Sequence, residues 1–97
     1  MFTLRLRAGA VADLRSILEY GSVNYGEEVA IAYVEAIDKT MERLREYPEI
    51  GETRPDFGKG LRSLPCREHR IYYRLAEQHI SVVRVLHKAM DAKRWLD

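Results

Sequence analysis

The strongest candidate for chemistry in this 97-residue sequence is a run of arginines and tyrosines near residue 70. Successive side chains of a strand point to opposite faces, so Arg70, Tyr72 and Arg74 are predicted on one face and the residues between them on the other. Guanidinium groups beside a tyrosine suit phosphates, carboxylates or a peptide lying across a sheet. The alternative is an ordinary solvated sheet face.

Flanking segments carry arginines that extend this surface if the strand register allows. Arg62 precedes the run and Arg84 follows it. We call the predicted surface the arginine face, and it comprises Arg62, Arg70, Tyr72, Arg74 and Arg84.

Other reactive side chains are few. Strand alternation places His87 on the face opposite Arg84, together with Ser81, Val83 and Val85, where it is either a structural residue or a general base. The single cysteine, Cys66, excludes an intrachain disulfide and is interpreted as a small strand residue. We expect no metal site and no cofactor, because the sequence contains no metal-binding or phosphate-loop motif.

The C-terminal tail is the second unusual feature. Trp95 is the only tryptophan, lies two residues from the end and follows Lys93 and Arg94. A tryptophan there either packs back onto the chain or waits for a partner, because chain ends otherwise fray.

The elements that must position these residues follow from periodicity. Residues 2–7 alternate as a strand, residues 10–25 and 27–47 have helical spacing, and Gly26 joins the two helices into an antiparallel hairpin. After a loop at 48–60, residues 61–67, 70–76 and 80–86 form a three-strand antiparallel meander, and 88–97 end in a short helix or turn. Pro65 predicts an edge or bulged strand. The first strand, residues 2–7, can pair with the last strand, residues 80–86, although nothing in the sequence determines the strand order.

The predicted fold is therefore α+β in two layers, with both helices over one face of the sheet and the arginine face uncovered. Residues 1–97 are expected to form a single domain. Net charge is only +1, yet residues 1–52 carry −4 and residues 53–97 carry +5, which favours an anionic partner for the basic half. No membrane segment and no signal peptide is recognised, so a cytoplasmic protein is expected.

Several short motifs occur in a specific order along nearly the whole chain. They are Asn24-Tyr25-Gly26, Tyr47-Pro48-Glu49-Ile50-Gly51, Leu61-Arg62-Ser63-Leu64, Ile71-Tyr72-Tyr73-Arg74 and Val83-Arg84-Val85-Leu86-His87. In this order the chain resembles the ParE toxins of the RelE/ParE superfamily, from bacterial type II toxin–antitoxin systems.

The resemblance implies a toxin that arrests growth by inhibiting DNA gyrase, with no catalytic residue of its own. It also implies a ParD-like antitoxin, bound in a heterodimer or heterotetramer, and contact with operator DNA only through that antitoxin. The expected partner-binding residues are Arg62, Arg70, Tyr72, Arg74, Arg84, Arg94 and Trp95.

Two alternatives stay open. A ribosome-dependent mRNA endoribonuclease of RelE type would need Arg62, Arg70, Arg84 and His87 as its catalytic set. The segment Lys88-Ala89-Met90-Asp91 argues against it, because it matches the ParE pattern and lacks the tyrosine-bearing end of active RelE-type nucleases. The third possibility is a silent module that only co-represses with its antitoxin.

Overall fold

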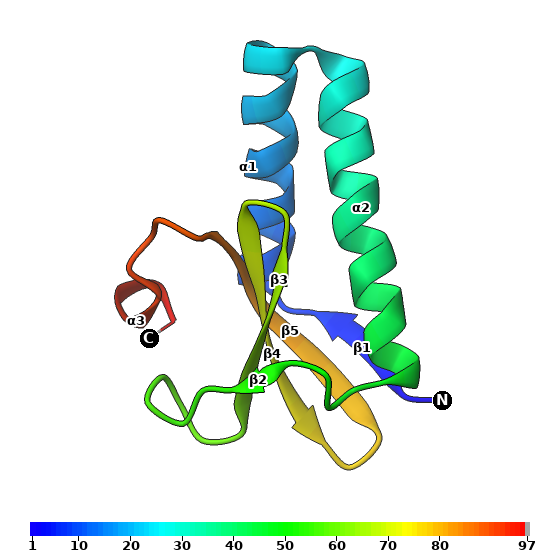
Figure 1. The fold of residues 1–97 in the computed structure, drawn as a ribbon, viewed down its shortest axis with the longest axis vertical. Coiled ribbons are helices and arrows are strands. Elements are labelled where there is room, and N and C mark those ends of the chain that lie inside the picture. The colour runs from blue at the N-terminus through cyan, green and yellow to red at the C-terminus, as the bar shows by residue number, and fades with distance from the viewer. Residues whose placement is uncertain (97) are drawn as a thin grey trace.

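The computed structural model describes residues 1–96 and confirms the α+β prediction (Figure 1). Its elements in chain order are β1 (Thr3–Leu6), α1 (Ala8–Tyr25), α2 (Glu27–Glu46), β2 (Glu52–Thr53), β3 (Leu61–Cys66), β4 (His69–Ala76), β5 (His79–His87) and α3 (Ala92–Trp95). The short strand β2 lies inside the segment that the sequence predicted to be loop throughout.

The sheet has the strand order β1-β5-β4-β3-β2. β1 lies parallel to β5, as its possible place beside the last strand suggested, and the other pairs are antiparallel. Pro65 lies on β3 beyond the residues that pair with β2, so its missing N–H removes no ladder bond on that edge. β3 is not an edge strand as a whole, because β2 pairs with its residues Arg62 and Ser63, and the edge-strand prediction therefore holds only locally at Pro65.

The two helices form the predicted antiparallel hairpin, joined at Gly26. Gly26 has φ = +96°, a backbone conformation that glycine adopts without the steric cost of a side chain. A Cβ at Gly21 would lie 3.0 Å from the Cβ of Ala30, so glycine allows the two helices to approach closely.

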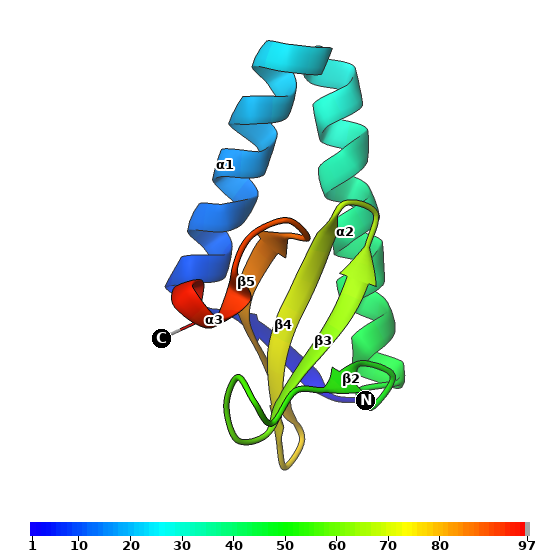
Figure 2. The ribbon, with the colours of Figure 1, turned by 60° about the vertical axis from the view of Figure 1, so that its left-hand side comes forward.

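The hairpin is longer than the sheet that it covers. α1 has 18 residues, which corresponds to about 27 Å at the usual helical rise. The joined ends of α1 and α2 therefore project beyond the β3–β4 turn (Figures 1 and 2). In this projecting part Tyr20, Val23, Tyr25 and Val29 are exposed.

The main core lies between the helices and one face of the sheet. Ile37, Met41 and Leu44 of α2 pack there against Ile71 and Tyr73 of β4. The hydroxyl of Tyr73 donates to the carbonyl of Pro48 at 2.7 Å and accepts the N–H of Gly51 at 2.9 Å. This buried tyrosine thereby fixes the start of the loop that follows α2.

The opposite face of the sheet carries a second, smaller core. Tyr72 and Leu86 are buried there together with Ala92, and Phe57 and Leu96 pack against them. The prediction of an uncovered face is therefore wrong at its centre, since Tyr72 is only 4% exposed. The tail and the loop before β3 cover it because the side chains at this centre are apolar.

Candidate functional site

The structure divides the predicted arginine face between the two sides of the sheet. Arg62 pairs with Tyr73, whereas Arg70 and Arg74 flank Tyr72 on the other side. Residues directly opposite each other in an antiparallel pair share a face. The expectation that Arg62 lies beside Arg70 is therefore wrong.

Arg62 instead supports the loop after α2. Its Nη1 donates to the carbonyls of Glu49 at 3.1 Å and Gly51 at 2.9 Å.

A bulge in β5 changes the predicted faces of that strand. Tyr72 pairs with Arg84 and Tyr73 with Val82, which leaves Val83 unpaired between them. Val83 consequently packs with the outer core while Val85 belongs to the main core. His87 follows Val85 on the helix side, so its predicted grouping with Val85 is confirmed. Its grouping with Ser81 and Val83 is wrong, because the extra residue reverses the alternation.

Arg84 is engaged within the chain. Its Nε and Nη2 donate to the two carboxylate oxygens of Asp13, both at 2.7 Å, and its Nη1 donates to the carbonyl of Trp95 at 2.9 Å. The hydrogen bond to Asp13 raises the pKa of Arg84. Such a bidentate charged pair is stronger than a neutral hydrogen bond. Arg84 thus joins α1, β5 and the tail, and its donors are directed at groups of this chain.

Three arginines of the predicted partner-binding set remain on the surface. The side chain of Arg70 forms no hydrogen bond or ion pair within residues 1–96, and the exposed side chain of Arg74 makes one long contact, from Nε to the carbonyl of Lys59 at 3.4 Å. The guanidinium carbon of Arg94 lies 5.9 Å from the ring centre of Trp95. Trp95 itself is 43% exposed, so the tail packs back chiefly through its neighbours Ala92 and Leu96.

The alternative nuclease set is not assembled. Arg62 and Arg70 lie on opposite faces of the sheet, and Arg84 is paired with Asp13. His87 lies on the helix side, where its Nδ1 accepts the N–H of Ala89 at 3.0 Å. These four side chains share no common position for a reacting group.

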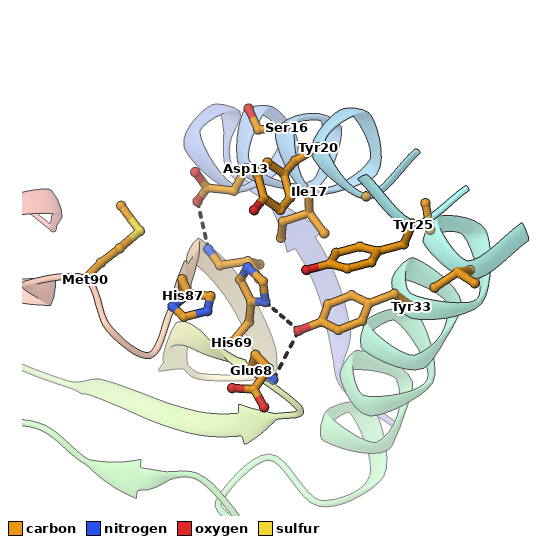
Figure 3. A pocket seen from close by; sticks show the side chains of 14 residues that line it. Asp13, Ser16, Ile17, Tyr20, Tyr25, Tyr33, Glu68, His69, His87 and Met90 are labelled. Atoms are coloured by element: carbon orange, nitrogen blue, oxygen red, sulfur yellow. Dashed lines mark hydrogen bonds between the residues drawn. The ribbon is translucent and has the colours of Figure 1, made fainter. Parts of the chain in front are cut away.

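A groove of about 500 Å³ lies between the helical hairpin and the sheet. It lies where the projecting helical hairpin passes the end of the sheet, so that α1, α2 and the ends of β4 and β5 form its walls (Figure 3). Its lining is mainly apolar and aromatic. The lining residues include Asp13, Ile17, Tyr20, Tyr25, Val29, Tyr33, His69, Val85, His87 and Met90.

A polar cluster forms the floor of this groove (Figure 3). The hydroxyl of Tyr33 accepts the N–H of Glu68 at 3.1 Å and lies 2.6 Å from Nδ1 of His69. The Tyr33 hydroxyl thereby joins α2 to the turn before β4. The ring of His87 meets His69 edge to face at 5.2 Å.

Burial favours the neutral forms of the two residues at the centre of this floor, Tyr33 and His69. Burial, followed by the repulsion of His87, lowers the pKa of His69. Burial also raises the pKa of the Tyr33 hydroxyl. The groove therefore offers apolar walls and a neutral, hydrogen-bonded floor, which suits an apolar segment of a partner.

Sequence reasoning missed this groove. By helical spacing, Ile17, Gly21 and Tyr25 lie on the apolar stripe of the first helix, and such a stripe usually packs into the core. The length of the helices could have indicated the groove. The two predicted helices are longer than the predicted strands, so some of their apolar residues must lie beyond the sheet.

Residues 1–96 contain neither a cluster of metal ligands nor a membrane-spanning helix. No three His, Cys, Asp or Glu side chains in this range gather where they would hold a metal ion. Among the same residues, no helix has both the length and the apolar character needed to cross a membrane.

Comparison with known families gives one match over most of the chain. The family model described as "ParE toxin of type II toxin-antitoxin system, parDE" matches residues 4–92. The protein named Toxin ParE1 from Caulobacter vibrioides is 32% identical over 92 residues, which are 95% of this chain and 95% of that protein. A protein of the same name from Mycobacterium tuberculosis is 32% identical over 90 residues, 92% of each chain.

Solved structures agree with these sequence relationships. A chain of the chromosomal ParDE system from P. aeruginosa superposes with a TM-score of 0.79 and 26% identity, covering 90% of this chain and 96% of its own. A chain of the RelBE2 toxin–antitoxin complex from Mycobacterium tuberculosis has a TM-score of 0.67 at 20% identity, covering 90% of this chain and 98% of its own. The latter likeness concerns the fold alone.

Proposed function

Because this chain belongs to the ParE family and is the toxin of a type II toxin–antitoxin system, we propose that it arrests growth by binding DNA gyrase in the cytoplasm. In this proposal the toxin acts by contact and breaks no bond itself. A ParD-like antitoxin neutralises it in a heterodimer or heterotetramer. Only the antitoxin contacts operator DNA, so the toxin reaches the operator through the antitoxin. The whole chain, residues 1–97, acts as one toxin domain.

The separation of the nuclease set is the observation that favours contact over cleavage. Phosphodiester cleavage by a protein needs a proton-transfer group and cationic groups around one phosphate. Here Arg62 and Arg70 lie on opposite faces, and Arg84 is bound to Asp13. His87 also lies away from Arg70, on the helix side of the sheet.

The antitoxin is proposed to occupy the groove. An amphipathic segment with apolar side chains would fill the space between Ile17, Tyr20 and Val29, all of which line it. Its acidic residues would remain outside the neutral floor. Burying these half-exposed aromatic and aliphatic side chains supplies the free energy of binding.

The target is proposed to contact the outer side of the sheet and the tail. Arg70, Arg74, Arg94 and Trp95 form the part of the predicted partner-binding set that stays at the surface. Tyr72 and Arg84 leave this set, because one is buried and the other is paired with Asp13. Arg62 leaves it because it lies on the other face.

Two assays test the proposal, one with the purified chain and one in cells that express it. Inhibition of supercoiling by purified gyrase is the expected result, and addition of the cognate antitoxin should relieve it. Primer extension on cellular mRNA after induction should show no codon-positioned cuts. Codon-positioned cuts with uninhibited gyrase would instead establish the endoribonuclease, and normal growth on expression alone would establish a silent co-repressor.

A further inference from the structure

The C-terminal tail is held on the outer side of the sheet by few contacts. Ala92 and Leu96 pack into the outer core, whereas Trp95 remains 43% exposed. α3 has only four residues, and Asp91 at its N-cap makes no side-chain capping bond. So short a helix is unstable by itself. The position of the tail is consequently determined by tertiary contacts.

Arg84 provides such a contact from the sheet. Its Nη1 donates to the main-chain carbonyl of Trp95 at 2.9 Å, while Nε and Nη2 are both bound to Asp13. Oδ2 of Asp13 also accepts the N–H of Val85 at 2.8 Å. Every nitrogen of the guanidinium donates a hydrogen bond, so Asp13 on one side and the Trp95 carbonyl on the other determine its orientation.

The first turns of α1 are shaped to admit this arginine. A Cβ at Gly9 would lie 2.8 Å from Cδ of Arg84, so a side chain at that position would displace the arginine stem. The side chains of Arg84 and Asp13 are 22% and 13% exposed. At this degree of burial, losing one partner leaves the other charge poorly solvated.

We propose that Asp13 and Arg84 are positioning residues for toxicity, which hold the backbone of Trp95 so that its ring and Arg94 are presented together on the outer side of the sheet. This inference rests on the proposed function in assigning the tail to the target surface. Asp13 and Arg84 themselves need not touch the target.

A substitution at position 84 can keep the positive charge while removing the hydrogen bonds that position the tail. A lysine at position 84 keeps the positive charge beside Asp13 but has one nitrogen in place of the planar fork. It cannot bind both carboxylate oxygens and the Trp95 carbonyl in the observed arrangement. Arg84→Lys is therefore expected to keep the fold and to release the tail.

Trp95 provides the readout, because it is the only tryptophan of the chain. Its fluorescence, excited selectively over tyrosine, reports how readily acrylamide reaches the tail. Arg84→Lys and Asp13→Asn are expected to increase the quenching constant and shift the emission to the red. Arg5→Lys is the matched control, since Arg5 is exposed on the same sheet and its side chain forms no hydrogen bond or ion pair within residues 1–96. Circular dichroism and thermal melting verify the fold of each variant.

The same variants are then compared in growth arrest. Arg84→Lys and Asp13→Asn should lose about tenfold in potency, within the usual coupling energy of residues that share a network. Arg5→Lys should keep both the quenching and the growth arrest of the parent chain. Should Asp13→Asn fail to fold, Arg84→Lys carries the test, because its charge stays paired.

Two results would overturn the inference. Unchanged quenching in folded Arg84→Lys would show that the pair does not position the tail. Increased quenching with undiminished growth arrest would show that tail position does not matter for toxicity. Failure of the gyrase proposal is recognised separately, when the parent chain arrests growth yet leaves purified gyrase uninhibited.

Discussion

At the scale of single residues, hydrogen bonds of buried tyrosines and histidines set the local structure. Tyr73 and Tyr33 each join segments far apart in sequence through one hydroxyl. Neither role is visible in the sequence, where both appear as apolar members of a strand or helix. The hydroxyl partners depend on where loops return, and strand or helix periodicity carries no information about that.

Removing the Tyr73 hydroxyl tests the first of these residues. Tyr73→Phe leaves the N–H of Gly51 and the carbonyl of Pro48 without their partner. We expect a loss of about 1–3 kcal/mol in the free energy of unfolding, the usual cost of unsatisfied buried groups. Urea denaturation measures it, with Tyr47→Phe as control because Tyr47 is 58% exposed. Equal stability of the two variants would contradict the assigned role.

His69 makes stability depend on pH. Its pKa is lowered in the folded chain by burial and by His87, while Asp13 and Glu68 oppose this shift. The unfolded chain therefore binds the proton more readily. Stability is complete above the unfolded pKa of about 6.5 and decreases as pH falls through that value.

Thermal melts between neutral and mildly acidic pH measure this effect. His69→Gln should flatten the pH dependence in that range, whereas exposed His79→Gln should leave it as in the parent chain. A parent-like profile for His69→Gln would assign the acid sensitivity to other groups.

At the scale of elements, the helical hairpin and the bulge in β5 decide which side chains meet. The sequence predicts both helices, their junction at Gly26 and every strand longer than two residues. Periodicity determines these features locally. The bulge at Val83 is a property of the β4–β5 pairing, so strict alternation through β5 misplaced Ser81 and Val83 relative to His87. The arginine face was mispredicted because the register between β3 and β4, which periodicity does not determine, pairs Arg62 with Tyr73 and so places it on the face opposite Arg70.

The hairpin also makes the antitoxin proposal testable with matched substitutions. Val29 lines the groove and is 56% exposed, whereas Val23 lies on the same hairpin, is 85% exposed and is absent from the lining. Val29→Glu should weaken antitoxin binding by about tenfold or more, because it places a charge in an apolar interface. Val23→Glu should change the affinity little. Isothermal titration calorimetry compares them, and equal effects would exclude the groove as the docking site.

At the scale of the whole molecule, the two oppositely charged halves of the sequence form different parts of the structure. The acidic first half forms β1 and the helical hairpin, and the basic second half forms most of the sheet and the tail. The resulting field favours an anionic partner at the sheet. The sequence could not predict that the tail and Phe57 cover the centre of that face, because such packing joins segments distant along the chain.

A double substitution tests the basic side of the molecule. Arg70→Ala with Arg74→Ala should raise the concentration needed to inhibit gyrase, most clearly at low salt, where exposed charges act over longer distances. The melting temperature should hardly change, since neither residue forms an ion pair within residues 1–96. Arg15→Ala with Lys39→Ala removes equal charge from the helices as control. A large fall in melting temperature would identify the two arginines as structural.

The single-residue junction at Gly26 affects how the groove proposed for the antitoxin can change in shape. Both helices end freely in solvent beyond the sheet, so adding or removing matched turns on either side of Gly26 leaves the main core untouched. Such changes would alter only the depth of the groove. Helix length at this junction thus offers a way to change the shape of the groove without altering the main core.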